Sequence, residues 1–173
     1  MQLMRIDKPI GFYLLMWPVL WAFLIASNGS PNLFYIIIFG IGIIATRSAG
    51  CIINDYFDQD FDKKVERTKN RVLATKQVSN PEALILFGLL ISICFILLLM
   101  LGLKIILFAS FSLFLLILYP LTKRYFKIPQ LILGLAFGSS IPMVFILEQG
   151  AIDANCILLY IITIMWAVTY DTY

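Results

Sequence analysis

The sequence predicts an all-α protein, a polytopic bundle of six transmembrane helices whose N-terminus is cytoplasmic. Three observations predict this fold class. Of the 173 residues, 61% are apolar and only 13% are charged, which is about half the charged share of soluble domains. Apolar runs long enough to cross a bilayer recur six times along the chain. Lysine and arginine concentrate in alternate loops between these runs.

Each apolar run supplies about 17 to 21 residues, the length that a helix needs to cross about 30 Å of hydrocarbon. We expect the spans at 10–26, 33–53, 83–102, 105–121, 131–147 and 156–172. The polar breaks between them are short, except for a long break at 54–82. One membrane domain over residues 1–173, with no soluble domain appended, is therefore expected.

The basic residues predict how the helices are oriented. The N-terminal segment has two, the following loops have none, six, one, three and none in order, and Arg47 lies inside the second run. Short loops rich in Lys and Arg stay in the cytoplasm, so the N-terminus and both basic loops are expected there. The lipid bilayer is the expected surrounding and no nucleic-acid partner is indicated. The absence of histidine from the sequence excludes Ser-His-Asp relays and His-ligated zinc or haem.

Half of the ten acids fall between Asp55 and Glu66. If the second helix continues outward, Asn54, Asp58 and Asp62 follow one another at i, i+4 and i+8 and share one face. Carboxylate and amide oxygens without His or Cys suit Mg²⁺, and like charges this close repel unless a cation lies among them. A solvated helix end, with ion pairs to the basic residues that follow, is the alternative.

Arg47 lies seven residues before Asn54 and therefore on the same helical face. A charge within an apolar run is costly and usually functional. Together with Arg67 and Arg71 it would form a cationic site for a diphosphate. Extension of the Arg47 side chain to the membrane surface is the alternative.

The second basic loop, 119–130, contains Lys123 and Arg124 among tyrosines and has no acids. Such a loop on the same side of the membrane as the carboxylates would hold an anionic aromatic substrate. Contact with lipid headgroups is the alternative.

Two glycine patterns occur inside membrane runs, Gly40-x-Gly42-x-x-Ala45 and Gly134-xxx-Gly138. The first matches a dinucleotide-binding loop only by chance. We interpret both as small residues that allow helices to pack closely.

These segments together resemble the UbiA superfamily of intramembrane prenyltransferases, and within it the branch that acts on 4-hydroxybenzoate. The resemblance runs through most of the chain, over 4–11, 17–22, 47–51, 67–71, 119–124 and 129–142, and includes the signature Asn54-Asp-x-x-Asp58-x-x-x-Asp62. The signature is specific for the superfamily, and the flanking segments indicate the hydroxybenzoate branch.

The resemblance implies a fold of about eight or nine spans around a cavity, and Mg²⁺ as the cofactor. It implies transfer of a polyprenyl group from polyprenyl diphosphate to 4-hydroxybenzoate, a step of ubiquinone biosynthesis, in a bacterial inner membrane or the mitochondrial inner membrane, with the active site on the cytoplasmic or matrix side. The implied roles are metal binding for Asn54, metal binding and catalysis for Asp58 and Asp62, diphosphate binding for Arg67 and Arg71, and binding of the aromatic acid for Arg124 with Lys123 nearby.

The sequence departs from this family at its end. Residues 166–173 resemble the approach to a second Asp-rich motif, but the motif itself is absent. We therefore expect a domain that is incomplete at its C-terminus, with a complementing C-terminal segment as a further candidate partner. Another superfamily branch (haem or quinone), a non-catalytic remnant, and a transporter are the competing interpretations.

Overall fold

A computed structural model describes residues 2–7, 9–66, 68–122 and 128–172, except the side chains of residues 120 and 121. Over this part of the chain it confirms the all-α class and has no strand. The helices are α1 (Ile10–Ala26), α2 (Leu33–Asp62), α3 (Asn80–Leu99), α4 (Leu103–Thr122), α5 (Pro129–Gly138), α6 (Ser140–Gln149) and α7 (Ala154–Thr172).

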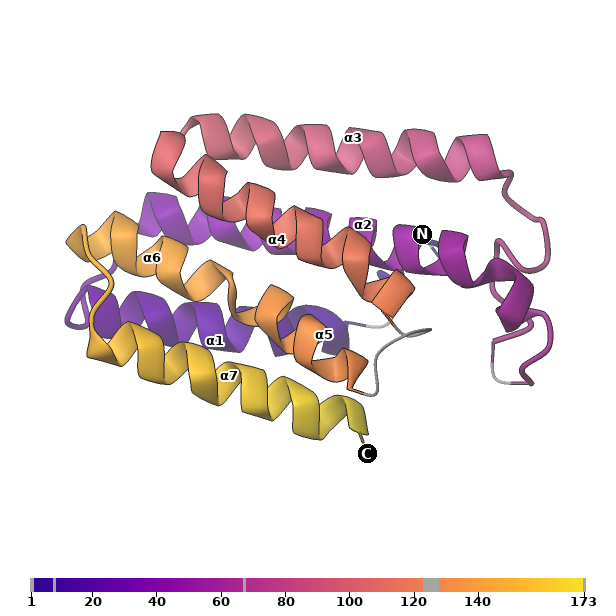
Figure 1. Ribbon diagram of the computed structural model, residues 1–173. Helices are drawn as coiled ribbons and strands as arrows, with labels where there is room; N and C mark the ends of the chain where they lie inside the picture. Colours follow the sequence, from indigo (N-terminus) through magenta and orange to yellow (C-terminus); the bar gives the residue numbers. More distant parts are fainter. Residues whose placement is uncertain (1, 8, 67, 123–127, 173) are drawn as a thin grey trace.

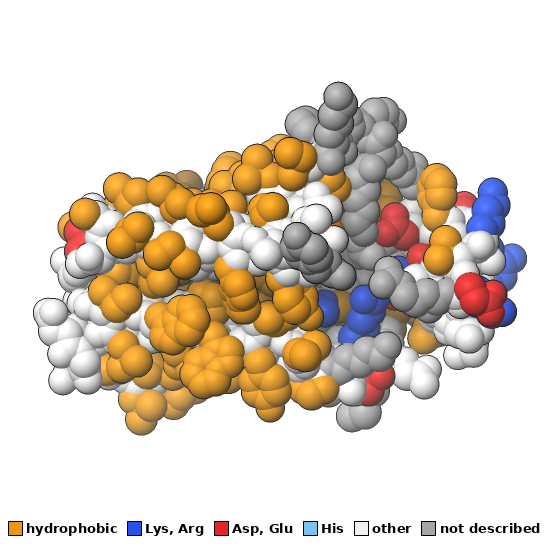
Figure 2. Space-filling model, turned by 90° about the horizontal axis from the view of Figure 1, so that it is seen from below, with side chains coloured by type: hydrophobic (Ala, Val, Ile, Leu, Met, Phe, Trp, Pro, Cys, Tyr) orange, Lys and Arg blue, Asp and Glu red, His pale blue; other side chains and the backbone are white. Residues whose placement is uncertain are grey.

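The helices lie side by side in one elongated bundle, with the loop between α2 and α3 at one end (Figure 1). The pairs with the most extensive contact are α5 with α7, α2 with α3, α4 with α5 and α1 with α6. In the face shown in Figure 2, hydrophobic side chains cover most of the length and charged side chains gather toward the end with this loop. An apolar belt with a charged end is the surface of a membrane protein.

Within the described residues, four helical segments are long and apolar enough to cross a membrane: α2, α3, α7, and α5 together with α6 (Pro129–Gln149). The two other apolar helices, α1 and the Leu103–Tyr119 part of α4, are shorter. Both pack within the same bundle. The number of six spans and the cytoplasmic N-terminus stay predictions.

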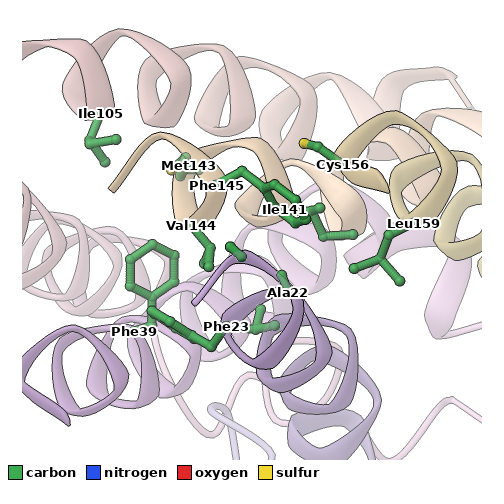
Figure 3. Close-up of a cluster of buried hydrophobic side chains, with 12 residues drawn as sticks. Ala22, Phe23, Phe39, Ile105, Ile141, Met143, Val144, Phe145, Cys156 and Leu159 are labelled. Atoms are coloured by element: carbon green, nitrogen blue, oxygen red, sulfur yellow. The ribbon is translucent and has the colours of Figure 1, made fainter. Parts of the chain in front are cut away.

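The main core lies where α1, α2, α6 and α7 meet, with Ile105 from the start of α4 beside them (Figure 3). Phe23 and Phe39 meet edge to face with ring centroids 5.3 Å apart, an arrangement that aromatic quadrupoles favour. Ile141, Val144 and Phe145 of α6 are fully buried against them. A second cluster joins α2 and α3 to the N-terminal segment and to the α2–α3 loop.

Local signals explain where several helices begin. The Asn32 side chain accepts a hydrogen bond from the Phe34 N–H at 3.0 Å at the start of α2, and Ser79 and Glu82 form a capping box at the start of α3. Asp153 accepts from the Cys156 N–H at 2.8 Å before α7. That backbone hydrogen bond holds the pKa of the Asp153 carboxyl below its usual range.

Most predicted spans agree with the helices, and α1 matches its span at both ends. The span expected at 131–147 is present as Pro129–Gln149, but it consists of two short helices interrupted at Ser139, which was not expected. Pro142 has no N–H to donate to the Gly138 carbonyl, and the Ser139 hydroxyl donates to the Ala136 carbonyl at 2.6 Å, so the regular ladder is interrupted here.

The structure confirms the packing role of one glycine pair and contradicts that of the other. A Cβ at Gly134 would lie 3.0 Å from the Ile164 carbonyl oxygen, and one at Gly138 would lie 2.5 Å from the Tyr160 ring. These glycines let α5 approach α7 closely. A Cβ at Gly40 or Gly42 would meet no described atom within 4 Å, so the expectation of close packing there is wrong.

We expect Gly138→Ala to lower the free energy of unfolding by about 1 to 3 kcal/mol, because the added methyl overpacks a tight contact. The Tyr160 ring cannot swing away without losing the hydrogen bond that its hydroxyl donates to the Leu135 carbonyl at 3.1 Å. Gly88→Ala in α3 is the matched control: a Cβ there meets open space, and alanine is favoured over glycine in a helix. Unfolding in mixed detergent micelles measures both, and equal stability of the two variants would contradict the α5–α7 packing.

Candidate functional site

A cavity of about 580 Å³ runs between the helices, within the size range of small-molecule sites. Its walls are mostly apolar side chains of α1, α2, α3, α4 and α5. The charged side chains that line it are Arg5, Arg47, Arg71 and Asp171, and the polar ones include Asn54, Tyr119 and Tyr170. The cavity thus suits a molecule with a long apolar part and an anionic group.

Arg47 lies where α2 faces α1. A Cβ on Gly11 would lie 2.5 Å from Arg47 Nε, so the absence of a side chain at Gly11 makes room for the guanidinium. Arg47 also donates a hydrogen bond to the Cys51 sulfur, one turn further along α2. The predicted intramembrane charge therefore has a defined place in the cavity wall.

The second helix continues outward to Asp62, as the proposed carboxylate face requires. Asn54, Asp58 and Asp62 accordingly follow one another along this helix at the predicted spacing. Asn54 lines the cavity, whereas neither Asp58 nor Asp62 is among its lining residues. Asp58 is half-buried and Asp62 is buried.

Asp62 accepts a hydrogen bond from Arg71 Nη1 at 2.8 Å. The structure therefore brings a predicted metal ligand and a predicted diphosphate ligand into direct contact. Among the described residues there is no group of three His, Cys, Asp or Glu side chains that could hold a metal ion. The predicted metal ligands, Asn54, Asp58 and Asp62, offer one amide oxygen and two carboxylates. Hard oxygen donors of this kind fit the chemistry of Mg²⁺.

Asp55 is a residue of this region that the sequence interpretation missed. It is only 3% exposed, and its Oδ1 lies 2.5 Å from Arg5 Nη2 and 3.1 Å from Arg71 Nη1. The periodicity of α2 carries the signal for it: Ser48 and Ile52 are buried, and steps of four and then three residues continue that stripe to Asp55. An acid on a buried stripe needs a cationic partner.

The alternative of ion-paired acids also describes part of this region. Lys63 pairs with Asp60 at 2.9 Å and Lys69 with Glu66 at 2.6 Å, and all four side chains are largely exposed. Such surface pairs contribute little to stability.

Several predicted site residues cannot be placed. Arg67, Lys123 and Arg124 lie outside the described residues. Two residues that do line the cavity, Tyr119 and Asp171, are in contact: the Tyr119 hydroxyl donates to Asp171 Oδ2 at 3.4 Å and links α4 to α7.

The fold and the cavity define a class, the polytopic helical membrane proteins with an internal cavity. Within it, the chain belongs to the UbiA prenyltransferase family, whose model matches residues 15–173.

Two curated relatives illustrate the similarity. The 4-hydroxybenzoate octaprenyltransferase of Azoarcus sp. (strain BH72) is 51% identical over 171 residues, which are 99% of this chain and 60% of that protein. The enzyme of the same name from Pseudomonas fluorescens (strain SBW25) is 47% identical over 172 residues, 99% of this chain and 58% of that protein. The chain thus spans about three fifths of the length of these relatives.

Two solved structures share the fold. The apo structure of a UbiA homolog from Aeropyrum pernix K1 superposes with a TM-score of 0.81 at 24% identity, over 97% of this chain and 62% of that one. A structure from work on digeranylgeranylglyceryl phosphate synthase in membranes gives a TM-score of 0.79 at 19% identity, over 96% of this chain and 58% of that one. At these identities the likeness concerns the fold alone.

We expect Arg71→Gln to lower the free energy of unfolding by about 2 kcal/mol or more, because it leaves the buried carboxylates of Asp55 and Asp62 without this partner. Lys69→Gln is the matched control, since it removes a cation from the same loop whose partner Glu66 is exposed, and should cost less than about 0.5 kcal/mol. Unfolding in detergent measures both. Similar losses for the two variants would show that the Arg71 pairs are no stronger than surface pairs.

Proposed function

We propose that this chain carries out transfer of a polyprenyl group from polyprenyl diphosphate to the ring of 4-hydroxybenzoate, with Mg²⁺ as cofactor. The observation that carries the proposal is the cavity, whose walls are apolar and whose polar lining includes three arginines. Family membership and the names of the curated relatives support the reaction and the aromatic substrate.

The apolar walls suit the isoprenoid tail, and the cavity's arginines suit its diphosphate. Arg47 and Arg71 both line the cavity, and guanidinium groups bind phosphate oxygens through paired, charge-assisted hydrogen bonds. Arg67, four residues before Arg71 in the sequence, is proposed as a further ligand of the same group.

Asn54, Asp58 and Asp62 are the residues proposed to hold the metal, with Asp58 and Asp62 thereby catalytic. Magnesium bound there supplies positive charge to the diphosphate leaving group. Arg71 already neutralises Asp62, so a cation that approaches this carboxylate competes with Arg71. A cation that displaced Arg71 from Asp62 would leave Arg71 paired with Asp55 alone, with more of its N–H groups available to the diphosphate, so the two binding events would be coupled.

The aromatic acid is proposed to be held through its carboxylate by Arg124, with Lys123 nearby. The allylic C–O bond to diphosphate breaks, a C–C bond forms at the ring carbon ortho to the hydroxyl, and that carbon loses its proton. The apolar walls exclude water, which would otherwise capture the allylic cation. No covalent intermediate with the protein is needed, in agreement with a sequence without histidine.

The charged end of the bundle is proposed to face the cytoplasm, or the matrix of a mitochondrion. The six lysines and arginines of the α2–α3 connection support this orientation, in a bacterial or mitochondrial inner membrane.

The proposal is tested with membranes that carry this chain, alone or with the C-terminal two fifths of the Azoarcus relative, incubated with polyprenyl diphosphate and radiolabelled 4-hydroxybenzoate. We expect prenylated product only when Mg²⁺ is present. Asp58→Asn should lower kcat/KM by about 100-fold or more, as loss of a group that stabilises the transition state does. Asp60→Asn, an exposed acid of the same helix, is the control and should retain activity. Equal activity of the two variants would exclude Asp58 as a metal ligand.

We further expect Arg124→Ala to raise KM for 4-hydroxybenzoate by about 10-fold or more while kcat changes little, because a contact made equally in the ground state and the transition state is lost. Steady-state kinetics at saturating polyprenyl diphosphate measure this. A rise confined to the KM for the diphosphate would assign Arg124 to the other substrate.

A further inference from the structure

The α2–α3 loop and the N-terminal segment converge on one buried carboxylate. Asp55 Oδ1 accepts from Arg5, which precedes α1, and forms an ion pair with Arg71, which follows α2. The side chain of Asp55 is 4% exposed, against 27% for Arg5 and 23% for Arg71. The acid is thus buried and fixed, while its two partners reach it from segments that lack regular structure.

Apolar contacts bring the same two segments together. Leu3 and Leu73 are buried in one cluster with Ala49 and Ile52 of α2. The ionic and apolar contacts therefore act at the same place, and they dock both segments against α2. Both arginines also line the cavity, so the docking determines where two of its positive charges lie.

We propose that Asp55 is a positioning residue that holds Arg5 and Arg71 at the charged end of the cavity, and that Arg5 is a further ligand of the anionic group bound there. The proposal rests on the anion site of the proposed function, but not on turnover. Asp55 itself acts only through the arginines. Its carboxylate is occupied by two guanidinium groups, and Asn54 rather than Asp55 is the cavity-lining residue of this helical turn.

Removal of the Asp55 charge should change anion affinity in opposite directions, depending on whether Asp55 positions the arginines or only contributes to the local electric field. Removal of a negative charge near an anion site strengthens anion binding if only the local field matters. If Asp55 positions the two arginines, its removal instead weakens binding, because the guanidinium groups lose their fixed geometry. Asp60→Asn changes the net charge by the same amount on the same helix, and Asp60 is exposed and pairs with Lys63 at the surface.

The experiment uses the purified full chain in lipid nanodiscs, with inorganic pyrophosphate as the probe and isothermal titration calorimetry as the measurement, with and without Mg²⁺. We expect Asp55→Asn and Arg5→Gln each to weaken pyrophosphate binding by about 10-fold, as loss of a partner of a buried charge pair does. The double variant should bind no more weakly than the weaker single variant, because both changes remove the same arrangement. Arg5→Lys should retain part of the affinity.

A second measurement is independent of binding. Trypsin cleavage after the exposed Lys69 should be faster in Asp55→Asn and in Arg5→Gln than in Asp60→Asn, because the undocked loop opens more often. If Asp55→Asn does not fold, the proposal can still be tested with Arg5→Gln, because Arg5 is only half-buried. Both pyrophosphate binding and trypsin cleavage can be measured on that variant.

Pyrophosphate affinity of Asp55→Asn equal to or above that of Asp60→Asn would overturn the positioning role, as would unchanged cleavage of the loop. Unchanged affinity in Arg5→Gln would overturn the ligand role of Arg5. Normal pyrophosphate binding without prenyl transfer would contradict the proposed function alone. Wild-type chain that fails to bind pyrophosphate would contradict both the anion site and the role of Arg5, while faster cleavage would still support docking by Asp55.

Discussion

The constraint on which this structure depends is that backbone polar groups inside a bilayer must be satisfied within the protein. The apolar runs meet it by forming helices, and α2 extends the same hydrogen-bond ladder nine residues past the expected end of its span, to Asp62. One rigid element therefore carries Arg47 within the apolar region and the acids at its end. The spacing of Arg47, Asn54 and Asp62 along α2 follows from helix geometry, without any help from loops.

The charges at the end of α2 are arranged in two environments. Asp60 and Glu66 make exposed pairs with neighbouring lysines, which neither hold the fold together nor restrict it much. Asp55 and Asp62 are buried, and both depend on Arg71. A single guanidinium thus links the two buried acids. This concentration of charge is costly unless every member is paired, and Arg71 supplies a partner for both acids.

Much of the fold could be predicted from the sequence, because length and hydropathy determine which segments cross a bilayer. The bounds of α1 and the outward continuation of α2 follow directly from the apolar run and the i, i+4, i+8 pattern. The interruption at Ser139 could be suspected from Pro142 but not located, since Pro18 lies inside α1 without interrupting it. Gly42 shows a different limit, because a small residue inside a span can face either a neighbouring helix or a cavity. The sequence does not distinguish the two, and in the structure Gly42 lines the cavity.

The candidate site was only partly predictable for a similar reason. Spacing places Asn54, Asp58 and Asp62 on one helix, but it does not reveal that Asp62 is paired with Arg71. Such a pair joins a helix to a loop, and loop geometry has no periodicity from which to predict it. Asp55 was detectable as an acid on a buried stripe, whereas its partner Arg5, 50 residues earlier, could be identified only from the folded chain.

The interruption between α5 and α6 has a mechanical consequence. Because α5 packs mainly on α7 and α6 on α1, the two halves of this segment follow different neighbours, and Ser139 and Ser140 at their junction line the cavity. A continuous helix would act as a stiff rod and transmit any displacement along its whole length. Two short helices joined at Ser139 can instead shift separately with the neighbours on which each packs, so the cavity wall is not one rigid element along this segment.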